Sequence, residues 1–227
     1  MPKRSIPLIN EEYYHIFNRG VNKQPIFLDK REYRRALDLI EFYSYSGKKI
    51  SYSRFLSMSL ENKEEYMKLL FQNNKKLINI VCFALMPNHF HFLLKQLEDN
   101  GISNFMSNFQ NSYSRYFNIK NNRIGHLLQG QFKSVHIEDD SQLLHLSRYI
   151  HLNPYSSCIV RSIEEVESYP YSSYHEYLNI KGSKICSKEI ILSQFRNLKD
   201  YQKFVSDRAS YQKELEKIKH LILEDRY

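Results

Sequence analysis

The chain has 227 residues, and its 33 Lys plus Arg against 25 Asp plus Glu give a formal net charge of +8 at pH 7. This length fits one large or two small domains. Hydrophobic residues make up 42% of the sequence, enough to form a core, which excludes a disordered chain. A mean hydropathy of -0.57 and the lack of an apolar run near the ~20 residues that span a bilayer argue against an integral membrane protein.

The composition favours a nucleic-acid partner. The chain holds 18 Tyr and 14 Phe with no Trp, and its isoelectric point is near 9.2. Basic side chains neutralise phosphate and aromatic rings stack on unpaired bases, although the same composition also follows from nucleotide bias. The first ten residues lack the apolar core of a secretory signal, so we expect a cytoplasmic protein. Cys82, Cys158 and Cys186 form no CxxC pair and are expected to be reduced packing residues.

The first predicted elements are a strand and a helix. Residues 12–18 alternate before an Arg-Gly turn, which predicts a strand with His15 on one face. Asp29 and Glu32 form a capping box that opens a helix, and apolar residues at helical spacing extend it to about Tyr45.

A basic stretch over residues 46–77 follows, in which the pattern weakens. It holds seven Lys or Arg against three Glu and one short helix predicted over residues 60–71. We expect a solvated insertion. The alternative is an auxiliary patch that follows a nucleic-acid backbone.

Two apolar runs, 77–85 and 89–94, are separated by Met-Pro-Asn and predict two buried strands joined by a tight turn. Ser103 is expected to cap a helix that ends before Asn121. Residues 132–137 alternate as a further strand.

The next helix is predicted to start near Asp139 and to stop at Pro154, and a Tyr-rich loop follows over residues 169–174. A final amphipathic helix is expected to have one apolar side formed by Leu215, Ile218, Leu221 and Ile222. The order strand, helix, two strands, helix, strand, helix predicts an α+β fold of the split ferredoxin-like kind, with a central, largely antiparallel sheet flanked by helices.

The sharpest local feature is the triplet His89-Phe90-His91. The period of two along a strand sends both imidazoles to one face, where they form half of a divalent-metal site. The triplet alone is a weak signal, because a histidine in a strand is often only a hydrogen-bonded neighbour. Imidazoles on an otherwise apolar strand need partners, however, and a metal ion would satisfy them.

A second feature lies near the end of the helix that stops at Pro154. Tyr149 and Asn153 are four residues apart and therefore lie one above the other on a single helix face. Taken alone, Tyr149 is an ordinary packing residue and Asn153 a helix stop.

Together these motifs resemble those of the REP-associated tyrosine transposases, which are single-tyrosine HUH endonucleases of the insertion-sequence transposase-like superfamily. The matching motifs, in chain order, are Tyr14-His15 with Asn18-Arg19-Gly20, Met86-Pro87-Asn88-His89-Phe90-His91, Gly130-Gln131-Phe132-Lys133-Ser134, and Arg148-Tyr149-Ile150 with Asn153-Pro154. The resemblance implies a ferredoxin-like or RRM-like HUH catalytic domain over residues 1–160, with 46–77 as a basic insertion. Residues 161–227 would then form a mostly helical C-terminal extension.

The resemblance also implies a catalytic site. His89 and His91 would bind Mg²⁺ or Mn²⁺, Asn153 would complete the coordination, and Tyr149 would be the nucleophile that forms a 5′-phosphotyrosine. The candidate DNA contacts are Lys133, Arg19 and Arg148, with a structural salt bridge as the alternative for Arg19. His15 is expected to be structural, with a place on the first strand facing the site as the alternative, and His145 is a weaker candidate for a place beside the nucleophile.

The implied function is that of a bacterial transposase, a metal-dependent single-stranded DNA endonuclease and strand transferase that acts at hairpin-forming REP elements. Its partner would be single-stranded or hairpin DNA and not a membrane, in the cytoplasm and at the nucleoid; monomer and homodimer both stay open. The alternatives are a nonenzymatic single-stranded nucleic-acid-binding module with the same topology, a rolling-circle replication or relaxase-type HUH nuclease, and a domesticated nuclease that no longer moves.

Overall fold

The computed structural model describes residues 7–73, 75–178 and 185–209. Its main elements are β1 (Tyr13–Arg19), α1 (Lys30–Tyr43), α2 (Tyr52–Leu56), α3 (Leu60–Asn73), β2 (Ile78–Met86), β3 (His89–Gln96), α4 (Gly101–Lys120), β4 (Lys133–Ile137), α5 (Asp140–Ser156), α6 (Ile163–Glu167), α7 (Tyr174–Tyr177), α8 (Glu189–Leu192) and α9 (Leu198–Ser206). The final helix predicted around Leu215 to Ile222 lies outside the described residues. No helix within these ranges is long and apolar enough to cross a membrane.

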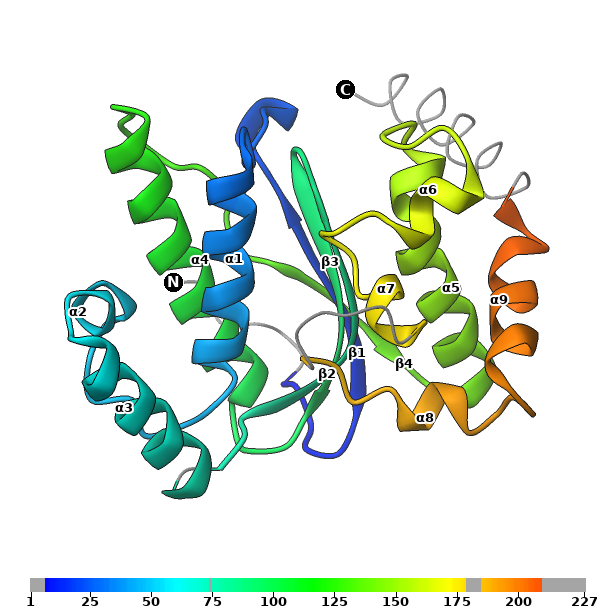
Figure 1. Cartoon of the computed structure of the whole chain (residues 1–227), viewed down its shortest axis with the longest axis horizontal. Coiled ribbons are helices and arrows are strands. Elements are labelled where there is room, and N and C mark those ends of the chain that lie inside the picture. The colour runs from blue at the N-terminus through cyan, green and yellow to red at the C-terminus, as the bar shows by residue number, and fades with distance from the viewer. Residues whose placement is uncertain (1–6, 74, 179–184, 210–227) are drawn as a thin grey trace.

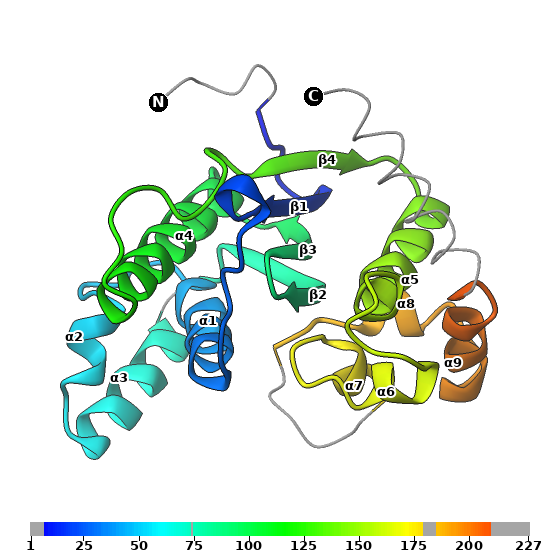
Figure 2. The same ribbon diagram turned by 90° about the horizontal axis from the view of Figure 1, so that it is seen from above.

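The four strands form one antiparallel sheet in the order β2-β3-β1-β4. Helices α1 and α4 lie on one face of this sheet, and α5 lies on the other face with the shorter helices α6 to α9 (Figures 1 and 2). The order of strands and helices is that of the split ferredoxin-like arrangement. The predicted α+β fold with an antiparallel sheet flanked by helices is therefore confirmed.

Alternate residues of the strands supply two hydrophobic cores, one on each face of the sheet. Ile16, Phe90 and Phe92 are buried on the side of α1 and α4. Leu93 of β3 is buried on the opposite side, in the core that includes Ile150 of α5. The odd-numbered residues of β1 and β3 therefore face α5, because successive side chains of a strand point to opposite faces.

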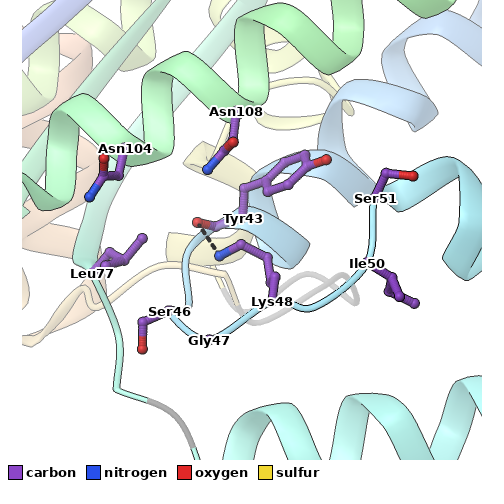
Figure 3. A pocket seen from close by; sticks show the side chains of 9 residues that line it. All are labelled: Tyr43, Ser46, Gly47, Lys48, Ile50, Ser51, Leu77, Asn104 and Asn108. Carbon is purple, nitrogen blue, oxygen red and sulfur yellow. Dashed lines mark hydrogen bonds between the residues drawn. The ribbon is translucent and has the colours of Figure 1, made fainter.

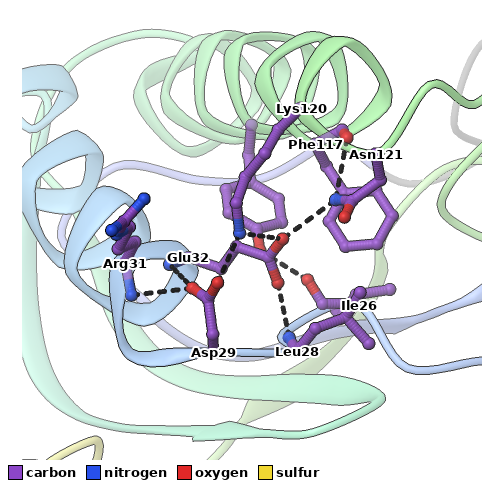
Figure 4. Close-up of polar contacts among 9 residues, drawn as sticks. Ile26, Leu28, Asp29, Arg31, Glu32, Phe117, Lys120 and Asn121 are labelled. Carbon is purple, nitrogen blue, oxygen red and sulfur yellow. Dashed lines mark hydrogen bonds and ion pairs between the residues drawn. The ribbon is translucent and has the colours of Figure 1, made fainter.

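Asp29 caps the start of α1 as predicted, but Glu32 returns its bond to Leu28, one residue before the cap, and it also connects two helices. Asp29 accepts a hydrogen bond from the backbone N–H of Glu32 at 3.1 Å. The fully buried carboxylate of Glu32 accepts hydrogen bonds from Lys120 Nζ (2.8 Å), Asn121 Nδ2 (2.9 Å) and the backbone N–H of Leu28 (Figure 4). The first turn of α1 is thereby fixed to the end of α4.

The stretch 46–77 folds as two helices, where one was expected. The prediction of a helix over 60–71 matches α3, and α2 was missed because it has only five residues. Tyr52 and Phe55 of α2 are buried, with ring centroids 5.1 and 5.2 Å from that of Phe42 in α1. The start of this stretch therefore adds to the core beside α1, which itself ends at Tyr43, two residues earlier than predicted.

Helix α4 begins at Gly101, two residues before the predicted cap Ser103. Asn100 takes a left-handed conformation with φ of 58° and turns the chain into the helix. A Cβ atom at Gly101 would lie 2.2 Å from the carbonyl oxygen of Leu77, a distance that no side chain tolerates. The helix start is therefore set by close backbone contact with the residue before β2 rather than by a serine cap.

Helix α5 continues through Pro154 to Ser156, whereas the sequence predicted a stop at the proline. Proline in the last turn removes only one backbone donor. Its own carbonyl oxygen accepts hydrogen bonds from the N–H groups of Ile159 (2.9 Å) and Val160 (3.1 Å), which close the end of the helix.

Residues 169–178 and 185–187 cover the outer edge of β2. Backbone hydrogen bonds join Leu85 N–H to the carbonyl of Tyr171 and Ser187 N–H to that of Ile80, both at 2.8 Å. Side chains of this segment add four more bonds to β2: Tyr169 and Tyr177 donate to strand carbonyls, and Ser173 Oγ lies within hydrogen-bond distance of both the N–H and the carbonyl of Phe83. A free strand edge is thereby paired.

Candidate active site

The register of the strands aligns five residues on the face that α5 covers. His91 on β3 lies opposite Phe17 on β1, which lies opposite Lys133 on β4. In the next row, His89 lies opposite Arg19. Directly opposed residues of an antiparallel pair share one face, so residues from three separate motifs meet there.

The ring of Tyr149 on α5 lies against the histidines of the sheet. Its centroid is 5.6 Å from that of His91, and the ring planes are nearly perpendicular at 88°. The rings of His89 and His91 are 5.0 Å apart, also at 88°. The structure therefore brings together the predicted nucleophile and two of the three predicted metal ligands.

Hydrogen bonds hold the Nδ1 atom of each histidine. His89 Nδ1 lies 2.6 Å from Asn88 Oδ1, and because an amide oxygen only accepts, the imidazole donates. His91 Nδ1 lies 2.8 Å from Nε2 of His15. With both Nδ1 atoms held, a metal ion would meet these histidines at Nε2. Histidine ligands in metal sites commonly have such outer hydrogen bonds.

Asn153 lies one helical turn beyond Tyr149 and is 1% exposed. Its Oδ1 accepts a hydrogen bond from Ser157 Oγ at 3.3 Å, whereas Nδ2 has no hydrogen-bond partner among the described residues. A buried amide group without a partner costs free energy, and rotation by 180° about the last bond would place the oxygen there instead. An orphaned amide of this kind fits a ligand position.

Within the described part of the chain, no group of three or more His, Cys, Asp or Glu side chains could hold a metal ion. The candidate ligand set is therefore two imidazoles and one amide, without a carboxylate. Such a sparse set fits a divalent ion that keeps other positions for phosphate oxygens and water.

Two exposed cations lie on the same face as the histidines. Arg19 Nε donates to Oε1 of Gln129 at 2.8 Å, which is a contact with a neutral amide rather than an acid. Beside it, the buried Asn18 bonds the carbonyl of Gly130 at 3.3 Å and fixes the loop that leads into β4. Lys133 is exposed at the start of β4.

A comparison with protein families gives a match that includes most of the candidate site residues. Residues 51–153 match the family of IS200-like transposases. This match covers 103 of the 227 residues, and the matched range is called the transposase domain below. The matched range includes His89, His91 and Tyr149 and ends at Asn153, while β1 with its His15 lies before it. None of the curated proteins matches the chain.

Most of the chain also has the fold of a solved structure. A REP-associated tyrosine transposase, solved bound to a REP hairpin, has 14% sequence identity and a TM-score of 0.50, covering 82% of this chain and 98% of its own. A candidate transposase from Deinococcus radiodurans has 12% identity and a TM-score of 0.36, covering 66% of this chain and 95% of its own. The predicted resemblance is confirmed as a match to the IS200-like transposase family over residues 51–153 and as the fold of the REP-associated transposase.

The structure does not direct Arg148 to the histidines of the transposase domain. Its guanidinium carbon lies 4.4 Å from the ring centroid of Phe204 on α9, and NH1 donates to the carbonyl of the same residue at 3.3 Å. NH2 contacts Nδ1 of His145 at 2.7 Å. Arg148 and His145 thus interact with each other and with α9, although Tyr149 is their neighbour in the helix.

A pocket of about 390 Å³ lies away from the histidines, between the end of α1, the insertion and α4 (Figure 3). Its lining includes Lys48, whose Nζ donates to the carbonyl of Tyr43 at 3.4 Å. Burial lowers the pKa of Lys48 to about 8. No predicted site residue of the transposase domain lines this pocket.

His15, for which a structural role was the default and a place facing the site the alternative, lies beside two of the candidate site residues. Its ring stacks on that of His91 at 5.1 Å and 19° and makes an edge-to-face contact with the ring of Tyr149 at 6.2 Å. The available signal was its position on the same strand face as Phe17. That signal could be used only with knowledge of which strand pairs with β1.

Proposed function

We propose that this transposase domain is a metal-dependent endonuclease and strand transferase that cleaves single-stranded DNA with Tyr149 as the nucleophile. The observation that carries the proposal is that the ring of Tyr149 on α5 lies against His91 on β3, whose ring in turn lies against that of His89. Three side chains from two separate elements thus meet at one place. A nonenzymatic binding module needs neither paired imidazoles nor a phenol beside them.

The proposed reaction exchanges one phosphate ester for another. The phenol oxygen of Tyr149 forms a bond to phosphorus, the bond to the 3′ oxygen breaks, and the phenol proton is passed on so that the products are a 5′-phosphotyrosine and a free 3′-hydroxyl. A divalent cation, Mg²⁺ or Mn²⁺, held by His89, His91 and Asn153 would supply positive charge at the scissile phosphate. The ester bond to Tyr149 keeps the strand available for joining to another 3′-hydroxyl.

The exposed cations suggest how DNA would lie on the domain. Arg19 and Lys133 lie on the same sheet face as the histidines and are proposed to contact phosphates on either side of the scissile bond. Arg148, held by Phe204, would reach DNA only beside α9. The solved relative bound to a REP hairpin supports hairpin-forming repeats as the substrate.

The domain boundaries and the location are part of the same proposal. Residues 1–160 would form the catalytic domain with its insertion at 46–77, and residues 161–227 an extension whose first part closes the edge of β2. The protein would act in the bacterial cytoplasm, on DNA of the nucleoid.

A covalent-adduct assay tests the proposal. The protein is incubated with single-stranded hairpin oligonucleotides from its own genomic flanks, with Mn²⁺ or EDTA, and a denaturing gel detects protein bound to DNA. Tyr149→Phe should abolish the adduct, whereas Tyr116→Phe, on α4 at the opposite face of the sheet, should keep it. Tight binding without an adduct, unchanged by His89→Ala, would instead support the nonenzymatic binding module.

A further inference from the structure

His15 lies beside both the proposed metal ligand His91 and the proposed nucleophile Tyr149. On β1 it pairs with Leu93, so it reaches His91 diagonally, two residues along β3. Its Nε2 lies 2.8 Å from His91 Nδ1, and its ring also contacts the edge of the Tyr149 ring. One half-buried side chain therefore contacts both groups on which the proposed chemistry depends.

The bond between the two imidazoles has two directions with different chemical consequences. If His15 Nε2–H donates, neutral His91 carries its proton on Nε2, and that nitrogen has no lone pair for a cation. If His91 Nδ1–H donates instead, its Nε2 keeps the lone pair. His91 can therefore act as a metal ligand through Nε2 only when His15 is the acceptor.

His89 also has a hydrogen bond at Nδ1, and in this bond only the imidazole can be the donor. Its Nδ1 donates to the Oδ1 atom of Asn88, so its Nε2 carries the lone pair in the neutral ring. The two imidazoles serve one ion only if both have this tautomer. If His15 accepts the hydrogen bond, His91 has the same tautomer as His89.

We propose that His15 is a positioning residue that accepts the Nδ1–H of His91 and holds it in the tautomer that binds the metal. This inference rests on the proposed function, because it assumes that His89 and His91 are the ligands. Removal of such an outer partner lowers metal affinity by roughly 10- to 100-fold in metal sites.

Phe17 provides a matched control for the stacking contribution. It lies directly opposite His91, on the same strand and face as His15, and its ring is 5.8 Å from that of His91 at an angle of 26°. It packs against the ligand without a polar atom. A purely structural role for His15 would make both residues equally important.

The first experiment measures the tautomer in metal-free protein. Long-range ¹H–¹⁵N NMR of ¹⁵N-histidine protein should show His91 as the Nδ1–H form in the wild type. His15→Gln, which keeps an acceptor, and Phe17→Leu should preserve this form, whereas His15→Phe, which keeps the ring but removes the acceptor, should shift His91 toward Nε2–H. An Nε2–H form of His91 in the wild type would overturn the proposal.

The second experiment titrates Mn²⁺ alone and follows free Mn²⁺ by electron paramagnetic resonance. His15→Phe should weaken binding by roughly 10- to 100-fold, and His15→Gln should restore much of that affinity. Equal affinity in the wild type and His15→Phe would show that His15 has no such role. His89→Ala separates the two levels: unchanged Mn²⁺ binding in that variant would overturn the proposed metal site itself.

Discussion

Buried polar side chains in this protein connect segments that are far apart in the chain. Glu32 joins the start of α1 to the end of α4, and its carboxylate accepts hydrogen bonds from three donors while fully buried. His151 on α5 plays the same part in the second core, where it bonds Tyr201 OH at 2.7 Å and Ser173 Oγ at 2.9 Å. Each residue has hydrogen-bond partners for its polar atoms, and these bonds offset the free-energy cost of burying them.

Glu32→Ala should lower the free energy of unfolding by about 3 kcal/mol or more, because it leaves Lys120, Asn121 and a backbone N–H without their acceptor. Urea denaturation measures the change. Arg34→Ala removes an ion pair on the same helix whose arginine side chain is 79% exposed, and should have little effect. Similar losses in both variants would contradict the importance of burial.

His151 should make the fold sensitive to mild acid. Burial lowers its pKa from 6.5 to about 3, so as pH falls the unfolded chain binds the proton first. The stabilisation from the neutral ring is complete above about pH 6.5 and decreases toward pH 3. Between pH 7 and pH 5 the free energy of unfolding should fall by about 2 kcal/mol from this residue.

Urea denaturation of the wild type and His151→Gln at pH 7 and pH 5 tests this effect. The variant should be less stable at pH 7, but its stability should depend less on pH. An identical pH dependence in both proteins would show that other groups cause the loss in acid.

At the scale of elements, the two edges of the sheet differ. The edge of β2 is paired by residues from the C-terminal part of the chain, while β4, with exposed Lys133 and Val135, pairs only with β1 among the described strands. The segment on β2 is held by more than hydrogen bonds, because Tyr169, Tyr174 and Tyr177 are buried in the second hydrophobic core. Opening of the segment would expose these rings, so it should be coupled to the packing of that core.

Ser173→Ala should loosen this contact at Phe83, and it also removes the Ser173 Oγ partner of His151 in the second core. Its hydroxyl oxygen accepts the N–H of Phe83 at 2.8 Å, so hydrogen exchange at that amide should become faster. The amide of Leu85, which bonds the carbonyl of Tyr171 at 2.8 Å, should be less affected. Ser168→Ala, an exposed serine of the same part of the chain, is the control, and equal exchange in all three proteins would contradict the assignment.

At the scale of the whole molecule, the basic side chains behind the net charge of +8 have different surroundings in different regions. Several lysines of the insertion lie against local partners: Lys75 pairs with Glu98 at 3.4 Å, and Lys76 lies 5.7 Å from the ring centroid of Tyr45. Arg19 and Lys133, by contrast, lie on the sheet face of the proposed site. We expect binding of DNA to depend on the second group.

Salt dependence of binding to a single-stranded oligonucleotide distinguishes the two groups. Lys133→Gln should reduce the slope of log affinity against log salt concentration by about 0.7, the value for one phosphate contact on a single strand. The double variant Lys49→Gln with Lys75→Gln, in the insertion, should leave the slope unchanged. A reduced slope in the double variant would establish the insertion as an auxiliary DNA-binding patch.

The sequence by itself determined the features that depend on spacing along the chain. The period of a strand places His89 and His91 on one face, and the period of a helix places Tyr149 above Asn153. The apolar runs and the capping box of Asp29 located the long elements, because these signals arise within a few residues. The motifs in order were sufficient to indicate the transposase family.

Only the tertiary structure decided the contacts between segments far apart in the chain. The diagonal contact of His15 with His91 depends on which strand pairs with β1, and the direction of Arg148 depends on the position of α9. Residues 169–178 and 185–187, which cover the edge of β2, form short helices and turns that are too short to show a periodic pattern in the sequence. Contacts of this kind follow from how two surfaces pack, and local patterns specify each surface but not its partner.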